Sequence, residues 1–140
     1  MLEPRDEMIK KMQYHELSEH IVTIYFNKVK VALGNQGAGG ESAFWDANSE
    51  IARQHSLVEA LLRSWVLSKV HSNSARAAAN AEEAGAVGIL GLSLKRNLVL
   101  ATNEYLKISR GSADDMSASA KTIVDTIERE LERGISERGK

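Results

Sequence analysis

Proline occurs once in the 140-residue chain, as Pro4. Every later residue can donate a backbone hydrogen bond, so no position after Pro4 forces a break in a helix. Pro4 itself suits the first turn of a helix, and Asp6 and Glu7 suit the positive end of the helix dipole. The chain is therefore free to form long, uninterrupted helices.

Apolar residues recur at steps of three and four along the chain, as one face of an α-helix requires. No segment of useful length alternates with the period of two that a strand would show. Polar and glycine-rich stretches divide the pattern at GNQGAGGE, HSNS and RGSADD. We predict an all-α fold in one domain, residues 1–140, built as a bundle of four long helices over about 5–33, 43–71, 75–109 and 113–137.

Glycines and a serine mark the expected helix ends. Gly34 and Gly111 are expected C-caps, and the Ser-x-x-Asp of residues 112–115 has the spacing of a capping box for the last helix. Three glycines also interrupt the third helix, each at a cost of up to about 1 kcal/mol. They predict either a break within 85–91 or a close approach of another helix. These residues are Gly85, Gly88 and Gly91.

Each helix carries an apolar stripe that we expect to face the core. In the first helix the stripe is Leu17, Ile21, Ile24 and Val31, beside a second face of Val22, Phe26, Val29 and Leu33. In the second helix the stripe is Ile51, Val58, Leu62 and Trp65. In the third helix it is Val87, Leu90, Leu94, Leu98, Ala101, Tyr105 and Ile108. In the fourth helix it is Met116, Ala120, Ile123, Ile127 and Leu131. The arcs of the first and third helices are wider than a slim bundle covers. Excess apolar surface of this kind marks an interface.

Composition excludes several classes of function. With 18 basic and 19 acidic residues, no whole-molecule field draws the chain to nucleic acid or an acidic membrane. The absence of cysteine excludes disulfides, thiolate chemistry and a cysteine zinc site. The start, MLEPRDEMIKK, lacks the apolar region of a secretory signal. The longest nearly apolar run, 84–94, is shorter than the roughly 20 residues of a membrane-spanning helix. We expect a cytoplasmic protein with no membrane partner.

The stretch YHELSEHIV resembles a metal-binding helix but has the wrong spacing. A zinc protease helix places two histidines four residues apart, so that both face one ion. His15 and His20 are five apart, which on a helix leaves them about 140° from each other. None of the four histidines follows a glutamate by three positions, as di-iron bundles require. We expect no metal and no cofactor, with His15 partly buried in the apolar arc and His20 on the surface.

His55 lies in the middle of an apolar stripe, between Ile51 and Val58. A lone histidine in such a place is more often a packed core residue than a catalytic base. Catalysis would also need an orienting partner and a nucleophile, and no motif supplies them. We therefore expect no catalytic residue and no enzymatic activity.

Residues 72–111 form the one net-positive segment, with five basic and three acidic side chains. Arg96, Asn103, Lys107 and Arg110 fall within about 60° of arc on the third helix, with Lys95 at the edge. Such a stripe suits contacts with phosphate that do not depend on base sequence, although a solvated helix face has the same pattern.

The wide apolar arcs lead us to expect a non-enzymatic protein that works by assembly, either as a homo-oligomer or as a small subunit of a larger complex. Its partner would be itself or another protein. The alternative expectation is a nucleic-acid-associated subunit that contacts the phosphate backbone through the basic stripe on the third helix.

Overall fold

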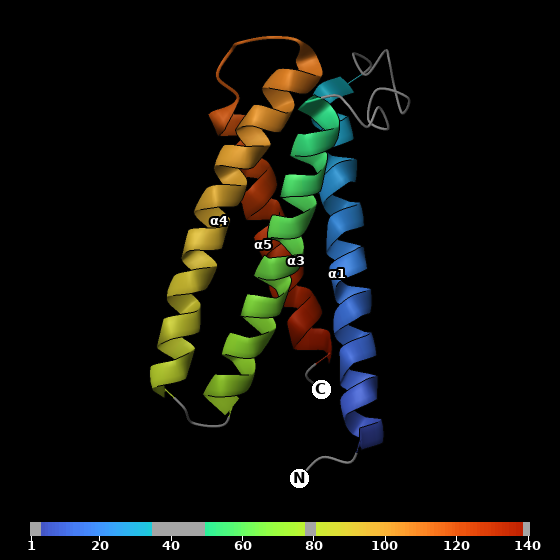
Figure 1. Cartoon of the computed structure of the whole chain (residues 1–140), viewed down its shortest axis with the longest axis vertical. Coiled ribbons are helices and arrows are strands. Elements are labelled where there is room, and N and C mark those ends of the chain that lie inside the picture. The colour runs from blue at the N-terminus through green and yellow to red at the C-terminus, as the bar shows by residue number, and fades with distance from the viewer. Residues whose placement is uncertain (1–3, 35–49, 78–80, 139–140) are drawn as a thin grey trace.

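The computed structural model describes residues 4–34, 50–77 and 81–138. These residues form four α-helices and, within the described ranges, no strand: α1 (Pro4–Leu33), α3 (Glu50–Ala77), α4 (Ala81–Arg110) and α5 (Ser117–Arg138). Successive helices run in opposite directions (Figure 1). The predicted all-α bundle of four long helices is confirmed.

The helices form a ring in which each touches two neighbours. α3 packs against α1 and α4, and α5 packs against the same two helices from the other side. α1 and α4 meet only weakly across the diagonal. The start of α1, the end of α3, the start of α4 and the end of α5 lie at one end of the bundle, and residues 111–116, which connect α4 to α5, lie at the other (Figure 1).

The two predicted C-caps are confirmed. Gly34 and Gly111 have φ angles of 61° and 66°, the left-handed region in which glycine carries no Cβ penalty. At Gly111 the backbone N–H groups of Gly111 and Ser112 donate to the carbonyls of Ile108 and Lys107, both at 3.1 Å. This pair of bonds is a Schellman motif, and it ends α4 sharply.

The predicted break at HSNS is wrong. α3 continues through His71 to Ala77, so residues 75–77 belong to this helix and not to the next. Ser72 is buried, and so is Ser68 one turn earlier. Packing of these small side chains in the bundle outweighs the weak helix propensity of serine and asparagine. The predicted start of this helix, 43–49, lies outside the described residues.

The predicted start of α5 is also wrong, because the helix begins at Ser117 and not near residue 113. The Asp115 carboxylate accepts hydrogen bonds from the backbone N–H of Ser117 at 2.9 Å and from its hydroxyl at 2.5 Å. These bonds lower the pKa of Asp115. The Asn103 side chain accepts a bond from the Met116 N–H at 2.8 Å. Two caps, the local Asp115 and Asn103 of α4, therefore replace the expected capping box.

The core is one cluster that receives a stripe from each helix. In α1 the buried residues follow steps of four: Leu17, Ile21, Tyr25, Val29 and Leu33. The expected place of Val31 in the core is wrong, since 79% of this residue is exposed. The stripes of α3 and α5 are confirmed at Val58, Leu62, Trp65, Ala120, Ile123, Ile127 and Leu131.

A buried hydrogen bond joins the diagonal helices α1 and α4. The Thr102 hydroxyl donates to the carbonyl of Leu98 at 2.6 Å and lies 2.8 Å from the Tyr25 hydroxyl. Because the single proton of Thr102 is already used, Tyr25 must be the donor between the two hydroxyls. Burial raises the pKa of Tyr25, so this phenol stays protonated and keeps donating.

This direction of donation predicts unequal costs for two isosteric substitutions. Tyr25→Phe removes one hydrogen bond and should lower the free energy of unfolding by about 1 kcal/mol. Thr102→Val leaves the buried Tyr25 hydroxyl without its acceptor, so its cost should reach about 2–3 kcal/mol. Urea unfolding of both variants measures the difference, and equal costs would contradict the assigned donor.

No break occurs in α4 at 85–91, so the alternative, a close helix approach, is the correct interpretation at Gly91. A Cβ built on Gly91 would lie 3.3 Å from the Ser68 hydroxyl oxygen of α3, tighter than ordinary contact. A Cβ on Gly88 would meet nothing within 4 Å. Only Gly91 is therefore required by the α3–α4 contact.

The contrast predicts opposite behaviour of two alanine variants. Gly88→Ala should raise the free energy of unfolding by about 0.5–1 kcal/mol, because alanine is the better helix former and the space is open. Gly91→Ala should lose that gain or destabilise, because Ser68 must move. Thermal unfolding of the two variants compares them directly; an equal gain in both would mean that the helices are not close at Gly91.

Candidate interaction surface

The two halves of α4 are buried to very different extents. Its C-terminal half buries Leu98, Ala101, Thr102, Tyr105 and Leu106. Its N-terminal half buries only Ala84 and Gly91, which are among the smallest residues available. The large side chains of that half, Ile89, Leu90 and Leu92, are exposed. The first three turns of α4 thus bring its backbone into the bundle but leave its apolar side chains in water.

Exposed large apolar side chains concentrate on α3 and α4. Among the described residues, six of the seven lie on these two helices, and the seventh is Val31 on α1. The six are Leu57, Leu67, Ile89, Leu90, Leu92 and Leu100. The predicted excess of apolar surface is therefore present on α4, is largely covered on α1, and extends to α3, where it was not expected.

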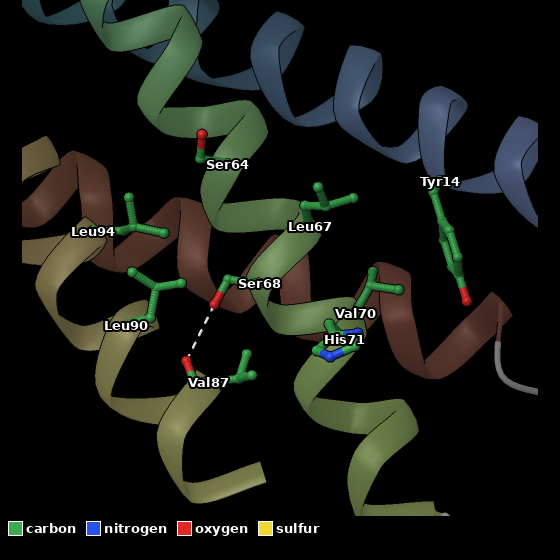
Figure 2. Close-up of a pocket in the computed structure, with 9 residues that line it drawn as sticks. All are labelled: Tyr14, Ser64, Leu67, Ser68, Val70, His71, Val87, Leu90 and Leu94. Carbon is green, nitrogen blue, oxygen red and sulfur yellow. Dashed lines mark hydrogen bonds between the residues drawn. The ribbon is translucent and has the colours of Figure 1, made fainter. Parts of the chain in front are cut away.

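A hollow of about 720 Å³ lies on this surface, over the outer side of α3 (Figure 2). Leu90 and Leu94 of α4 bound it on one side, and Tyr14 of α1 stands at the other. Leu67 of α3 projects into the space between them. The small residue Ser64 forms part of the floor. The hollow is almost entirely apolar in its walls, which suits an apolar side chain better than a polar ligand.

Polar groups lie at the edge of this hollow. The Ser68 hydroxyl donates to the carbonyl of Val87 at 3.3 Å, as the dashed line in Figure 2 shows. The Nε2 of His71 lies 2.6 Å from a carboxylate oxygen of Glu83. An acidic group therefore marks the end of the hollow nearest the α3–α4 connection.

The opposite side of α4 is tied to α5 by charge. The Lys95 ammonium lies 3.0 Å from carboxylate oxygens of both Asp125 and Glu128. Lys69 of α3 lies 3.7 Å from Glu128 and 3.6 Å from Glu132. Partial burial alone would lower the pKa of Lys95, but its hydrogen bonds to the two carboxylates outweigh burial and raise it. This network joins three helices.

The five residues of the predicted basic stripe share α4 but not one function in the structure. Lys95 pairs with α5, Asn103 caps α5, and Lys107 lies 3.4 Å from Glu104. Arg110 donates to the Ala32 carbonyl at 2.5 Å, which ties α4 to the end of α1. Within the described part of the chain, Arg96 alone of the five takes no hydrogen bond or ion pair and is exposed. Phosphate binding by the stripe stays a prediction.

The histidines of the YHELSEHIV stretch do not meet. His15 and His20 are both exposed, so the expected partial burial of His15 is wrong. His15 falls within the apolar arc that the sequence shows, but the stripe of α1 that is buried is narrower than this arc. Among the described residues, no three histidine or carboxylate side chains gather as a metal ion would require. The expectation that the chain binds no metal stays a prediction.

His55 packs at the edge of the core between α1 and α4. Its ring stacks on Phe26 with centroids 4.2 Å apart and lies 6.3 Å from the ring of Tyr105. Its Nε2 is 3.7 Å from a carboxylate oxygen of Glu59. Burial lowers the pKa of His55, and the nearby Glu59 charge offsets this only in part.

Among the helices that the structure describes, α4 alone is long and apolar enough to cross a membrane. Only 22% of its most apolar 18-residue window is buried in the bundle. The same window contains no more than two charged residues. Length and composition alone are weak evidence for a membrane segment. They agree, however, with the excess of exposed apolar side chains on α4.

Comparison of the chain with family models, with curated proteins and with solved structures gives no match.

The environment of His55 predicts a stability change at mildly acidic pH. A folded-state pKa below the unfolded value of about 6.5 means that the unfolded chain binds more protons between the two values. Stability is thus complete above pH 6.5 and is lost as the pH falls through the folded pKa. In His55→Gln this loss should disappear, so the free energy of unfolding should fall less steeply as the pH drops below 6.5 than it does in the wild type. Urea midpoints across pH 5–8 measure it; identical slopes would refute the assignment.

Proposed function

We propose that the protein is a non-enzymatic helical assembly protein that associates with copies of itself through the outer surface of α3 and α4. The observation that carries the proposal is the concentration of exposed large apolar side chains on these two helices. An excess of exposed apolar side chains on one part of a protein is a mark of interaction sites. The remaining helices contribute only Val31 to the large apolar side chains exposed among the described residues.

Two further features support self-association. The surface contains both a projecting leucine, Leu67, and a hollow that an apolar side chain fits. A surface with both a projection and a matching hollow can pair with itself, as isologous interfaces do. The near-zero net charge of −1 also leaves little electrostatic repulsion between copies.

Light scattering coupled to size exclusion tests the proposal. At micromolar concentration the mass should exceed the 15.4 kDa of one chain. Leu67→Glu should raise the dissociation constant at least about tenfold, because a charge would enter an apolar contact. Val31→Glu is the matched control, since Val31 is 79% exposed on α1 and lies outside the surface, and it should change the constant by less than about twofold.

A monomer at every accessible concentration would overturn the proposal. Binding of that monomer to lipid vesicles, lost in Leu67→Glu and kept in Val31→Glu, would assign the surface to a membrane instead.

A further inference from the structure

The outer face of α3 carries a second, exposed stripe that its buried stripe does not explain. Leu57, Ala60, Ser64 and Leu67 follow one another at steps of three, four and three, and all are exposed. Leu57 is 48% exposed and Leu67 is 63% exposed. Steps of three and four in alternation are the spacing by which one helix packs along another. We call these four residues the α3 seam.

The α3 seam is symmetric about its midpoint at position 62. Leu57 and Leu67 lie five positions to either side, and Ala60 and Ser64 lie two positions to either side. We propose that a second copy of the chain docks here with its α3 antiparallel, related by a two-fold axis through this midpoint. Leu57 of each copy then faces Leu67 of the other, and Ala60 faces Ser64. The proposal rests on self-association through α3 and α4 and adds its geometry.

Residue size along the α3 seam fits this arrangement. The two central residues are small, so the backbones can approach closely where the helices cross. The leucines lie farther out, and the hollow beside Ser64 and Leu67, closed by Leu90 and Leu94 of α4, lies at one end only. Under the two-fold axis, Leu57 of the second copy reaches this hollow. Each copy thus supplies one projecting leucine and one hollow.

Charge at the two ends favours one orientation. Arg53 continues the stripe at one end, four residues before Leu57; its side chain is 74% exposed and its guanidinium lies 3.0 Å from the Glu50 carboxylate. His71, paired with Glu83, continues it at the other end, four residues after Leu67. Antiparallel docking brings Arg53 of each copy to Glu83 of the other. Parallel docking would place Arg53 against Arg53 and Glu83 against Glu83, which like charges oppose.

Spin labels measure the orientation, because the chain contains no native cysteine. Ser56→Cys and Glu50→Cys place labels on exposed positions outside the α3 seam. With a rise of 1.5 Å per residue, antiparallel helices separate the two copies of position 56 by about 18 Å along the axis and those of position 50 by about 36 Å. Parallel helices give nearly equal distances at both sites.

The results separate the two proposals. An oligomer whose label distance grows from position 56 to position 50 supports the antiparallel α3 pair. An oligomer with equal distances, or with no label pair within range at either site, overturns the geometry and leaves self-association in place. A monomer overturns both.

A charge exchange is the second test. Arg53→Glu should weaken association at least about fivefold, and Arg53→Glu with Glu83→Lys in one chain should restore most of it. Each chain then carries the reversed pair, so a two-fold interface regains both contacts at once. Failure of the double variant to bind better than Arg53→Glu, with both variants folded by circular dichroism, would overturn the antiparallel pairing.

Discussion

A helix in a ring of four touches two neighbours, so about half of its circumference can be buried. α1 and α5 largely respect this limit, because the large apolar side chains whose burial is described in them fall on the buried half, with Val31 as the exposed exception among these. α3 and α4 exceed it. Each has a buried stripe that builds the common core and a further apolar face for which the ring provides no cover. The shape of the molecule and its proposed function both follow from this surplus.

The contact between α3 and α4 enlarges the surplus. Gly91 lies against Ser68, and a Cβ at that glycine would already be crowded. Small residues at the line of contact let two helix backbones approach closely. The larger side chains beside the contact, Leu67 on α3 and Leu90 on α4, then lie on its outer rim. Gly91 therefore lets the two helices come together, and the leucines beside this contact face water.

Much of the fold could be predicted from the sequence. The period of the apolar residues and the scarcity of proline gave four helices, and Gly34 and Gly111 gave two of their ends, because these signals are local. The prediction of a helix break at HSNS was wrong because Ser72 is buried in the bundle. The local sequence of a helix does not show that kind of tertiary packing. The start of α5 was misplaced partly for the same kind of reason, since one of the two side chains that cap it, Asn103, lies on α4.

The interaction surface was predicted only in part. A helical projection showed that α4 was too apolar to be covered, but it assigned Leu90 to the core, where the structure leaves it exposed. The α3 seam was missed although its spacing is visible in the sequence. The stripe from Val58 to Trp65 already gave α3 one buried face, so a second apolar face was not sought. Ala60 and Ser64 are small, and they indicate a helix contact only once Leu57 and Leu67 are known to be exposed. Likewise, Lys95 and Arg110 have partners on other helices. A projection of α4 alone places both residues on one basic arc and cannot show those partners.

The proposed association does not depend on the contacts that hold the bundle together. The core that joins all four helices is complete within one chain, with Leu62 and Trp65 of α3 fully buried in it. The ion pairs that join α5 to α4 and α3, formed by Lys95 and Lys69, also lie on the side of α4 away from the α3 seam. Association through the outer face of α3 would therefore join monomers that are already folded, unlike obligate dimers in which the interface is part of the core. Charges introduced at Leu57 or Leu67 act on a surface in contact with water, so their effect on association can be measured in a chain that keeps its bundle.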